Sequence, residues 1–160
     1  MRIVVAAVGR LKPGPDRELA RRYQDRAIKA GRALGLRGPD VIEVKESRAR
    51  EAERRVTEEA IALNGAAPDD AIKIALDSRG QNASSDTFAE FIRAWRDGGR
   101  DAVCFIIGGA DGLAASLLDD ADMSLAFGSA TWPHQLVRIM LMEQIYRAMT
   151  ILCGHPYHRD

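Results

Sequence analysis

The chain has 160 residues with 23 basic and 23 acidic side chains, and its 46% hydrophobic and 29% charged residues exclude a disordered chain or a fibrous repeat. Its two cysteines exclude a disulfide scaffold and a four-cysteine zinc site. No apolar run approaches the roughly 20 residues of a membrane span, and the apolar start is too short for a signal peptide, so we expect a single cytoplasmic domain over residues 1–160.

Apolar runs alternate with helical patterns along most of the chain. Residues 2–8 are rich in β-branched side chains and stop at Gly9, which is typical of a buried strand. A charged helix is predicted from about Asp16 to Leu36, where glycines and a proline end it. A short strand follows at residues 40–45. These patterns begin the alternation of strand and helix that defines the fold class.

The middle of the chain continues this alternation. An Arg- and Glu-rich helix is predicted from Arg48 to about Leu63, with Ser47 as its N-cap and Asn64-Gly65 as its end. The next strand is predicted at residues 72–77. The polar stretch at residues 78–85 is predicted to be a loop, and a helix follows it to about Asp97.

Residues 103–107 form an apolar run that predicts a central strand covered on both faces. Strands separated by helices indicate a single α/β domain with a mostly parallel sheet and helices on both faces. Ligands bind at the carboxyl ends of the strands in such sheets. Three loops are predicted there, at residues 76–80, 108–112 and 127–133.

The loop at residues 108–112, GGADG, directly follows the central strand. Adjacent glycines let a ligand approach the backbone without an intervening Cβ. The spacing is not that of a dinucleotide fingerprint, and a Walker lysine is missing. A plain turn explains a glycine pair equally well.

The last predicted helix, His134 to Leu152, follows Pro133 and is apolar on nearly every side. A helix of this kind must be covered all round, so we expect a homodimer through it; burial within one chain is the alternative. Glu143 and Arg147 are four residues apart, which predicts an ion pair.

All three histidines lie near the end of the chain: His134, His155 and His158. The tail also contains Tyr157 and Arg159, which indicates a functional segment, although a solvated polar tail is the alternative. We expect no metal site, because the tail histidines have no evident cysteine or carboxylate partner.

Charge is unevenly distributed along the chain. Residues 1–60 carry 15 Lys or Arg and 10 Asp or Glu, whereas residues 61–160 carry 8 and 13. A basic half can contact nucleic acid, because phosphate contacts supply much of the sequence-independent affinity. Alternatively, these arginines form the solvated face of a helix.

Four segments together carry a resemblance to a known family: LDSRG, IIGGADGL, TWPHQLVRIMLMEQIYRA and the terminal HPYHRD. With the opening MRIVVAAVGRLK, they make the whole chain resemble the RlmH (YbeA-like) ribosomal RNA methyltransferases of the SPOUT class. The last thirty residues are the most specific part of this resemblance. It implies an α/β fold with a C-terminal trefoil knot, which the periodicity of the sequence does not show.

The resemblance also implies a function. Members of the family bind S-adenosylmethionine in a bent conformation, form a homodimer through the knot region, and methylate N3 of a pseudouridine in the 23S ribosomal RNA of assembled ribosomes. They have no separate RNA-binding domain, which suits a short neutral chain. The cofactor positions carried over are Leu76, Gly108, Phe127, Gly128, Ser129, Ala130, Thr131, Trp132 and Pro133, with backbone groups expected to matter more than the Trp132 side chain.

Methyl transfer to an imide nitrogen requires loss of its proton, in-line placement of the methyl group and a base held out of its stack. His134 and His158 are the candidate general bases. Arg138 and Arg159 are candidates for stabilising uracil oxygens or holding phosphate. Tyr157 is a candidate for stacking on a base or donating a hydrogen bond. If a dimer places one tail beside the other chain's cofactor, the site is shared.

Two other functions fit parts of the sequence. A non-catalytic ribosome-binding or assembly factor of the same fold explains the basic N-terminal half, but it leaves the glycine loop and the tail unexplained. A small α/β enzyme that uses another nucleotide fits only if the glycine loop is considered in isolation.

Overall fold

The computed structural model describes residues 1–158, which form a five-stranded parallel sheet with helices on both faces. The strand order is β2-β1-β4-β3-β5. The strands are β1 (Arg2–Val8), β2 (Arg37–Val44), β3 (Ile72–Asn82), β4 (Ala102–Ile107) and β5 (Met123–Ala126). The helices are α1 (Pro15–Gly31), the short 3-10 helix η1 (Arg32–Leu34), α2 (Ala52–Ala66), α3 (Ser85–Asp97), α4 (Ala115–Asp120) and α5 (His134–Leu152). The predicted fold class is confirmed.

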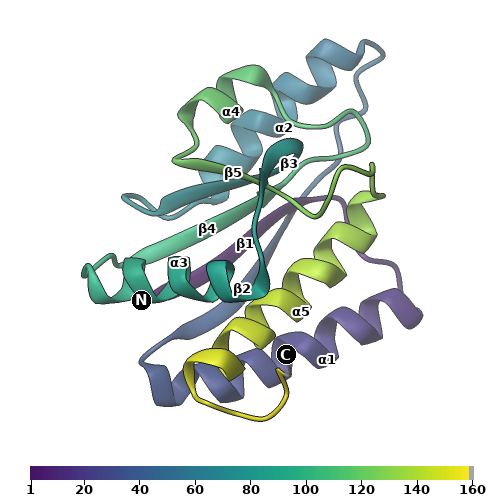
Figure 1. Ribbon diagram of the computed structural model, residues 1–160. Helices are drawn as coiled ribbons and strands as arrows, with labels where there is room; N and C mark the ends of the chain where they lie inside the picture. Colours follow the sequence, from purple (N-terminus) through teal and green to yellow (C-terminus); the bar gives the residue numbers. More distant parts are fainter. Residues whose placement is uncertain (159–160) are drawn as a thin grey trace.

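The two faces of the sheet carry different cores. Helices α1, α3 and α5 cover one face, and α2 and α4 cover the other (Figure 1). Side chains alternate between the faces along each strand, so Ile3 belongs to the first core and Val4 to the second. The central strand β4 is buried along its whole length, as its apolar sequence predicts.

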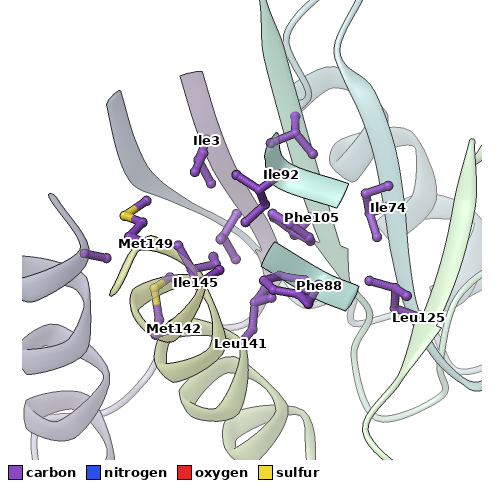
Figure 2. Close-up of a cluster of buried hydrophobic side chains, with 14 of the residues drawn as sticks. Ile3, Ile74, Phe88, Ile92, Phe105, Leu125, Leu141, Met142, Ile145 and Met149 are labelled. Atoms are coloured by element: carbon purple, nitrogen blue, oxygen red, sulfur yellow. The ribbon is translucent and has the colours of Figure 1, made fainter. Parts of the chain in front are cut away.

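The larger core lies between the sheet and helices α3 and α5 (Figure 2). Phe105 of β4 is completely buried, and its ring centroid lies 5.6 Å from that of Phe88 on α3. Leu141 and Ile145 of α5 are also fully buried in this cluster. The apolar pattern of α5 is therefore satisfied largely within one chain, between α1, α3 and the sheet. Leu136 of α5 is still 39% exposed. The homodimer through α5 stays a prediction.

Helix α2 differs from its predicted bounds. It begins at Ala52 rather than Arg48, and Ser47 does not cap it: the Ser47 hydroxyl donates to Glu58 at 2.6 Å and accepts from the Ala49 N–H at 3.1 Å. Asn64-Gly65 lies inside the helix, which ends at Ala66. Burial of Leu63 against the sheet holds this last turn in helical form despite the glycine.

Strand β3 continues beyond Asp77 to Asn82, so part of the predicted polar loop is a strand. This extension pairs with β5 after an irregularity between Leu76 and Gln81. A Cβ on Gly80 would lie 2.7 Å from the Leu125 backbone, so glycine permits the close approach. Strand β5 and helix α4, with only four and six residues, are not predicted from the sequence pattern.

A buried arginine attaches α5 to the strand ends. Arg138 is 2% exposed, and its guanidinium donates to Glu43 Oε1 at 2.7 Å, to the Gly9 carbonyl at 2.9 Å and to the Val8 carbonyl at 3.2 Å. Burial lowers the pKa of Arg138, and the charge of Glu43 opposes this effect. The first turns of α5 are thus fixed to the carboxyl ends of β1 and β2.

Within residues 1–158, no helix is both long enough and apolar enough to cross a membrane.

Replacing Phe105 with Ala should lower the free energy of unfolding by about 3–5 kcal/mol. The substitution removes buried apolar surface and also leaves a cavity beneath α3 and α5. Urea denaturation followed by circular dichroism measures this loss of stability. Ile61→Ala is the matched control, since Ile61 is 70% exposed, and should change stability by less than about 0.5 kcal/mol. Equal losses for the two variants would contradict the described core.

Arg138→Met should lower the free energy of unfolding by about 2–4 kcal/mol, because Glu43 and the carbonyls of Val8 and Gly9 lose the hydrogen bonds that the guanidinium donates. Arg10 offers a matched control: it also pairs with Glu43, at 3.5 Å, but its side chain is 84% exposed. Arg10→Met should therefore cost less than about 0.5 kcal/mol. A small effect of both substitutions in urea denaturation would refute the anchoring role of Arg138.

Candidate functional site

A cavity of about 570 Å³ opens at one edge of the sheet, beside residues 76–78 of β3 and the carboxyl ends of β4 and β5. Its volume lies within the range of roughly 300–1,000 Å³ that is typical of small-ligand sites. All three loops predicted at this edge contribute to its wall. Of the positions carried over as cofactor contacts, those that line it are Leu76, Gly108, Phe127, Gly128, Ala130, Thr131, Trp132 and Pro133. Ser129 is not among the lining residues.

The glycine loop forms the wall that follows β4. Its turn is closed by a hydrogen bond from the Gly112 N–H to the Gly109 carbonyl at 3.2 Å. A Cβ on Gly108 would lie 2.6 Å from the Gly112 carbonyl oxygen. Glycine at position 108 is therefore required by the loop itself, and the loop presents backbone rather than side chains to the cavity.

The loop at residues 127–133 forms the opposite wall. The Trp132 indole N–H donates to the Phe127 carbonyl at 2.9 Å, and the Gly128 N–H donates to the Asn82 side-chain oxygen at 2.9 Å. The first bond closes this loop, and the second fixes it to the end of β3. Trp132 is 44% exposed. Pro133 is the N-cap position of α5, so the wall continues directly into that helix.

Two carboxylates near the cavity, Asp77 on β3 and Asp111 in the glycine loop, are each paired with an arginine. Asp77 accepts from Arg79 at 2.9 Å, and this bonding lowers the pKa of Asp77. Asp111 accepts from Arg55 of α2 at 2.7 and 3.0 Å, which lowers the pKa of Asp111. The second pair attaches the glycine loop to α2.

The candidate catalytic residues do not all lie together. His134 lines the cavity at the start of α5. Arg138 lies one turn further, but it points into the protein interior and does not line the cavity. The expectation that Arg138 contacts substrate oxygens therefore lacks support in this structure, because Nη1 and Nη2 bond to Glu43 and two carbonyls, and Nε is buried with no hydrogen-bond partner among residues 1–158.

The tail packs on the other half of α5. The Tyr157 hydroxyl donates to Glu143 Oε1 at 3.1 Å, and His158 lies 3.4 Å from Arg147 Nη1 and 3.5 Å from Asp86. Glu143 is nine residues after His134, which corresponds to about 13 Å along a helix. The tail of a chain is thus well separated from the cavity of the same chain. Arg159 lies outside the described residues.

The tail is held by a compact polar and aromatic cluster. The Glu143–Arg147 ion pair predicted from helical spacing is confirmed, with Nη2 2.5 Å from Oε1. The Arg147 guanidinium lies 4.9 Å from the centroid of the Tyr157 ring, which also packs on Tyr146. Burial raises the pKa of Tyr157, and hydrogen bonds with Tyr23 and Glu143 raise it further, so the phenol stays protonated.

Sequence reasoning missed several residues of this region. Asp77, Leu113 and Val137 line the cavity; all three belong to segments that carry the family resemblance, but none of them is predicted as a contact residue. Glu59 was treated as part of a charged helix, yet it is 6% exposed and lies behind the glycine loop. Helical periodicity on α2 carried the only available signal, since Glu59 lies one turn before buried Leu63. Among residues 1–158, no cluster of three His, Cys, Asp or Glu side chains is arranged to hold a metal ion.

Comparison with known proteins gives consistent similarities. A family model described as "Predicted SPOUT methyltransferase" matches residues 1–158. The chain is 57% identical over 159 residues to the ribosomal RNA large subunit methyltransferase H of Bradyrhizobium sp. (strain ORS 278), covering 99% of this chain and 98% of that protein. It is also 57% identical over 159 residues to the protein of the same description from Nitrobacter hamburgensis, covering 99% of each.

Among solved structures, the chain is similar to "a probable methylase family protein" from Haemophilus influenzae Rd KW20. The TM-score is 0.51 at 12% identity, over 99% of this chain and 70% of that one, which is a likeness of fold. The family model over residues 1–158 and the 57% identity over nearly the whole length of the relatives show the family as well as the fold. The chain belongs to the SPOUT methyltransferase family.

Proposed function

We propose that this protein is an S-adenosylmethionine-dependent methyltransferase that modifies N3 of a pseudouridine in 23S ribosomal RNA, acting on assembled ribosomes in the cytoplasm. The observation that carries the proposal is the loop-walled cavity at the sheet edge, in a chain 57% identical to proteins named as large-subunit ribosomal RNA methyltransferases. The target nitrogen, the nucleotide and the use of whole ribosomes follow from the family resemblance.

The cavity fits the proposed cofactor. Leu76 and Trp132 offer apolar surface for an adenine ring, while the backbone around Gly108 and residues 127–133 offers donors and acceptors for its edge. Glycine at position 108 lets the loop keep its close backbone contact with Gly112, which gives this wall of the cavity its shape. When bound, S-adenosylmethionine would supply an activated methyl group on a cationic sulfur.

The protein's own residues would then prepare the acceptor. His134 lies at the cavity wall, where an imidazole can take the proton from an imide nitrogen. Its position depends on Arg138, which fixes the next turn of α5 to the strand ends. We assign Arg138 this positioning role in place of direct contact with the base.

The tail would complete the site from a second copy of the chain. Tyr157 and His158 dock on their own α5 near Glu143 and Arg147, away from their own cavity. A homodimer through α5 can bring one chain's tail to the other chain's cavity.

The knot implied by the family resemblance also stays a prediction.

Gly108→Ala should weaken S-adenosylmethionine binding at least about tenfold, because the new Cβ collides with the Gly112 carbonyl and forces the loop open. Isothermal titration calorimetry measures the Kd directly. Gly65→Ala is the matched control, since a Cβ on Gly65 meets nothing within 4 Å. Unchanged affinity of the Gly108 variant would count against the cavity as the cofactor site.

Removal of residues 155–160 should leave cofactor affinity within about twofold and abolish methyl transfer, because residues 155–158 are not part of the cavity wall. Affinity is measured by calorimetry and transfer by a labelled methyl group. Full activity without these residues would remove Tyr157, His158 and Arg159 from the mechanism.

The substrate is tested with labelled S-adenosylmethionine and three acceptors: unmodified assembled ribosomes, free large subunits and naked large-subunit RNA. We expect label on the ribosomes at a single pseudouridine and little on naked RNA, because a chain of zero net charge depends on the shape of the ribosome for recognition. Cofactor binding without label on any acceptor would favour a non-catalytic ribosome-binding factor.

A further inference from the structure

Glu59 of α2 is a buried acid that the proposed mechanism does not use. The residue is 6% exposed. Its Oε1 accepts a hydrogen bond from the Ser47 N–H at 3.0 Å. Its Oε2 is buried and has no hydrogen-bond partner among residues 1–158. A buried carboxylate oxygen without a donor is unfavourable, so its retention in this position calls for a physical reason.

The unpaired oxygen lies directly behind the cavity wall. A Cβ on Gly109 would be 2.8 Å from Glu59 Oε2 and 3.1 Å from a methyl group of Val8. Gly109 itself lines the cavity. The backbone of Gly109 therefore lies between the Glu59 carboxylate and the space available to a ligand, and no side chain at this position screens the charge.

The neighbouring charges leave Glu59 without an ion pair. Arg55 lies one helical turn away, but its guanidinium makes two bonds to Asp111 and further bonds to the Ala49 and Arg50 carbonyls, at 3.1 and 2.9 Å. Asp77 on another wall is matched by Arg79. Among residues 1–158, Glu59 takes part in no ion pair. The charge of Arg55 also acts on Glu59, but Arg55 is already paired with Asp111, so the three side chains together keep one negative charge where burial weakens solvent screening.

We propose that Glu59 makes the cavity selective for cationic ligands, so that it holds the sulfonium S-adenosylmethionine more tightly than the neutral thioether S-adenosylhomocysteine. The inference rests on the proposed function, because it takes S-adenosylmethionine as the ligand. Methyl loss removes the positive charge from the bound molecule. The same carboxylate then holds the product less tightly, which favours its exchange for fresh cofactor. Glu59 acts through its charge and is a specificity-determining residue, with no contact to the reacting atoms.

Glu59→Gln tests this with little change of shape, because a glutamine oxygen can still accept from the Ser47 N–H. Calorimetry on the full chain compares three ligands: S-adenosylmethionine, S-adenosylhomocysteine, and an analogue with a protonated amine in place of the sulfonium. We expect the Kd of both cationic ligands to rise about tenfold and that of the neutral thioether to change less than about twofold. Glu58→Gln is the matched control: Glu58 is adjacent but exposed, and all three affinities should stay within about twofold.

Thermal unfolding shows whether each variant is folded. Should Glu59→Gln fail to fold, Glu59→Met removes the same charge with a side chain suited to a buried site and must give the same selective loss. Equal weakening of all three ligands, or no weakening, overturns the proposal while leaving the methyltransferase assignment intact. Failure of the unaltered protein to bind either S-adenosylmethionine or S-adenosylhomocysteine overturns the proposed function and this inference together.

Discussion

The contact between Arg138 and the ends of β1 and β2 is the constraint on which the site depends. A buried guanidinium must be given acceptors, and here they are the Glu43 carboxylate and the carbonyls of Val8 and Gly9. These acceptors belong to the same edge of the sheet at which the cavity opens. Because the Arg138 guanidinium bonds to these acceptors, the first turn of α5, which contains His134, lies against the carboxyl ends of the strands.

The cavity is built mainly from backbone, and helix α2 supports it from behind. Arg55 holds the glycine loop through Asp111, and Glu59 lies beneath Gly109. Consequently the loop can omit side chains where a ligand must approach, while its charge and position come from residues of another element. This division explains how a wall with few functional groups of its own can still distinguish ligands by charge.

The cavity and the tail lie at different levels of α5. His134 is at the first turn, whereas Tyr157 and His158 dock beside Glu143 and Arg147 more than two turns later. One chain thus carries two parts of the proposed site without bringing them together. In the proposed homodimer, a second copy of the chain would bring its tail to this cavity, which would make oligomerisation part of the proposed chemistry as well as a source of stability.

The fold class and the three loops of the site can be predicted from the amino-acid sequence. The apolar run of β4, the strand at residues 2–8 and the bounds of α5 all have strong local signals, because strand and helix burial impose different periodicities. Short elements such as β5 have too few residues to show a period, and the extension of β3 is stabilised by pairing with β5 rather than by its own polar sequence. Tertiary structure alone decided that Arg138 faces inward and that Glu59 lies behind Gly109. An arginine or glutamate in a helical pattern is identical in sequence whether it is solvated or buried, and its role depends on acceptors and neighbours from distant parts of the chain.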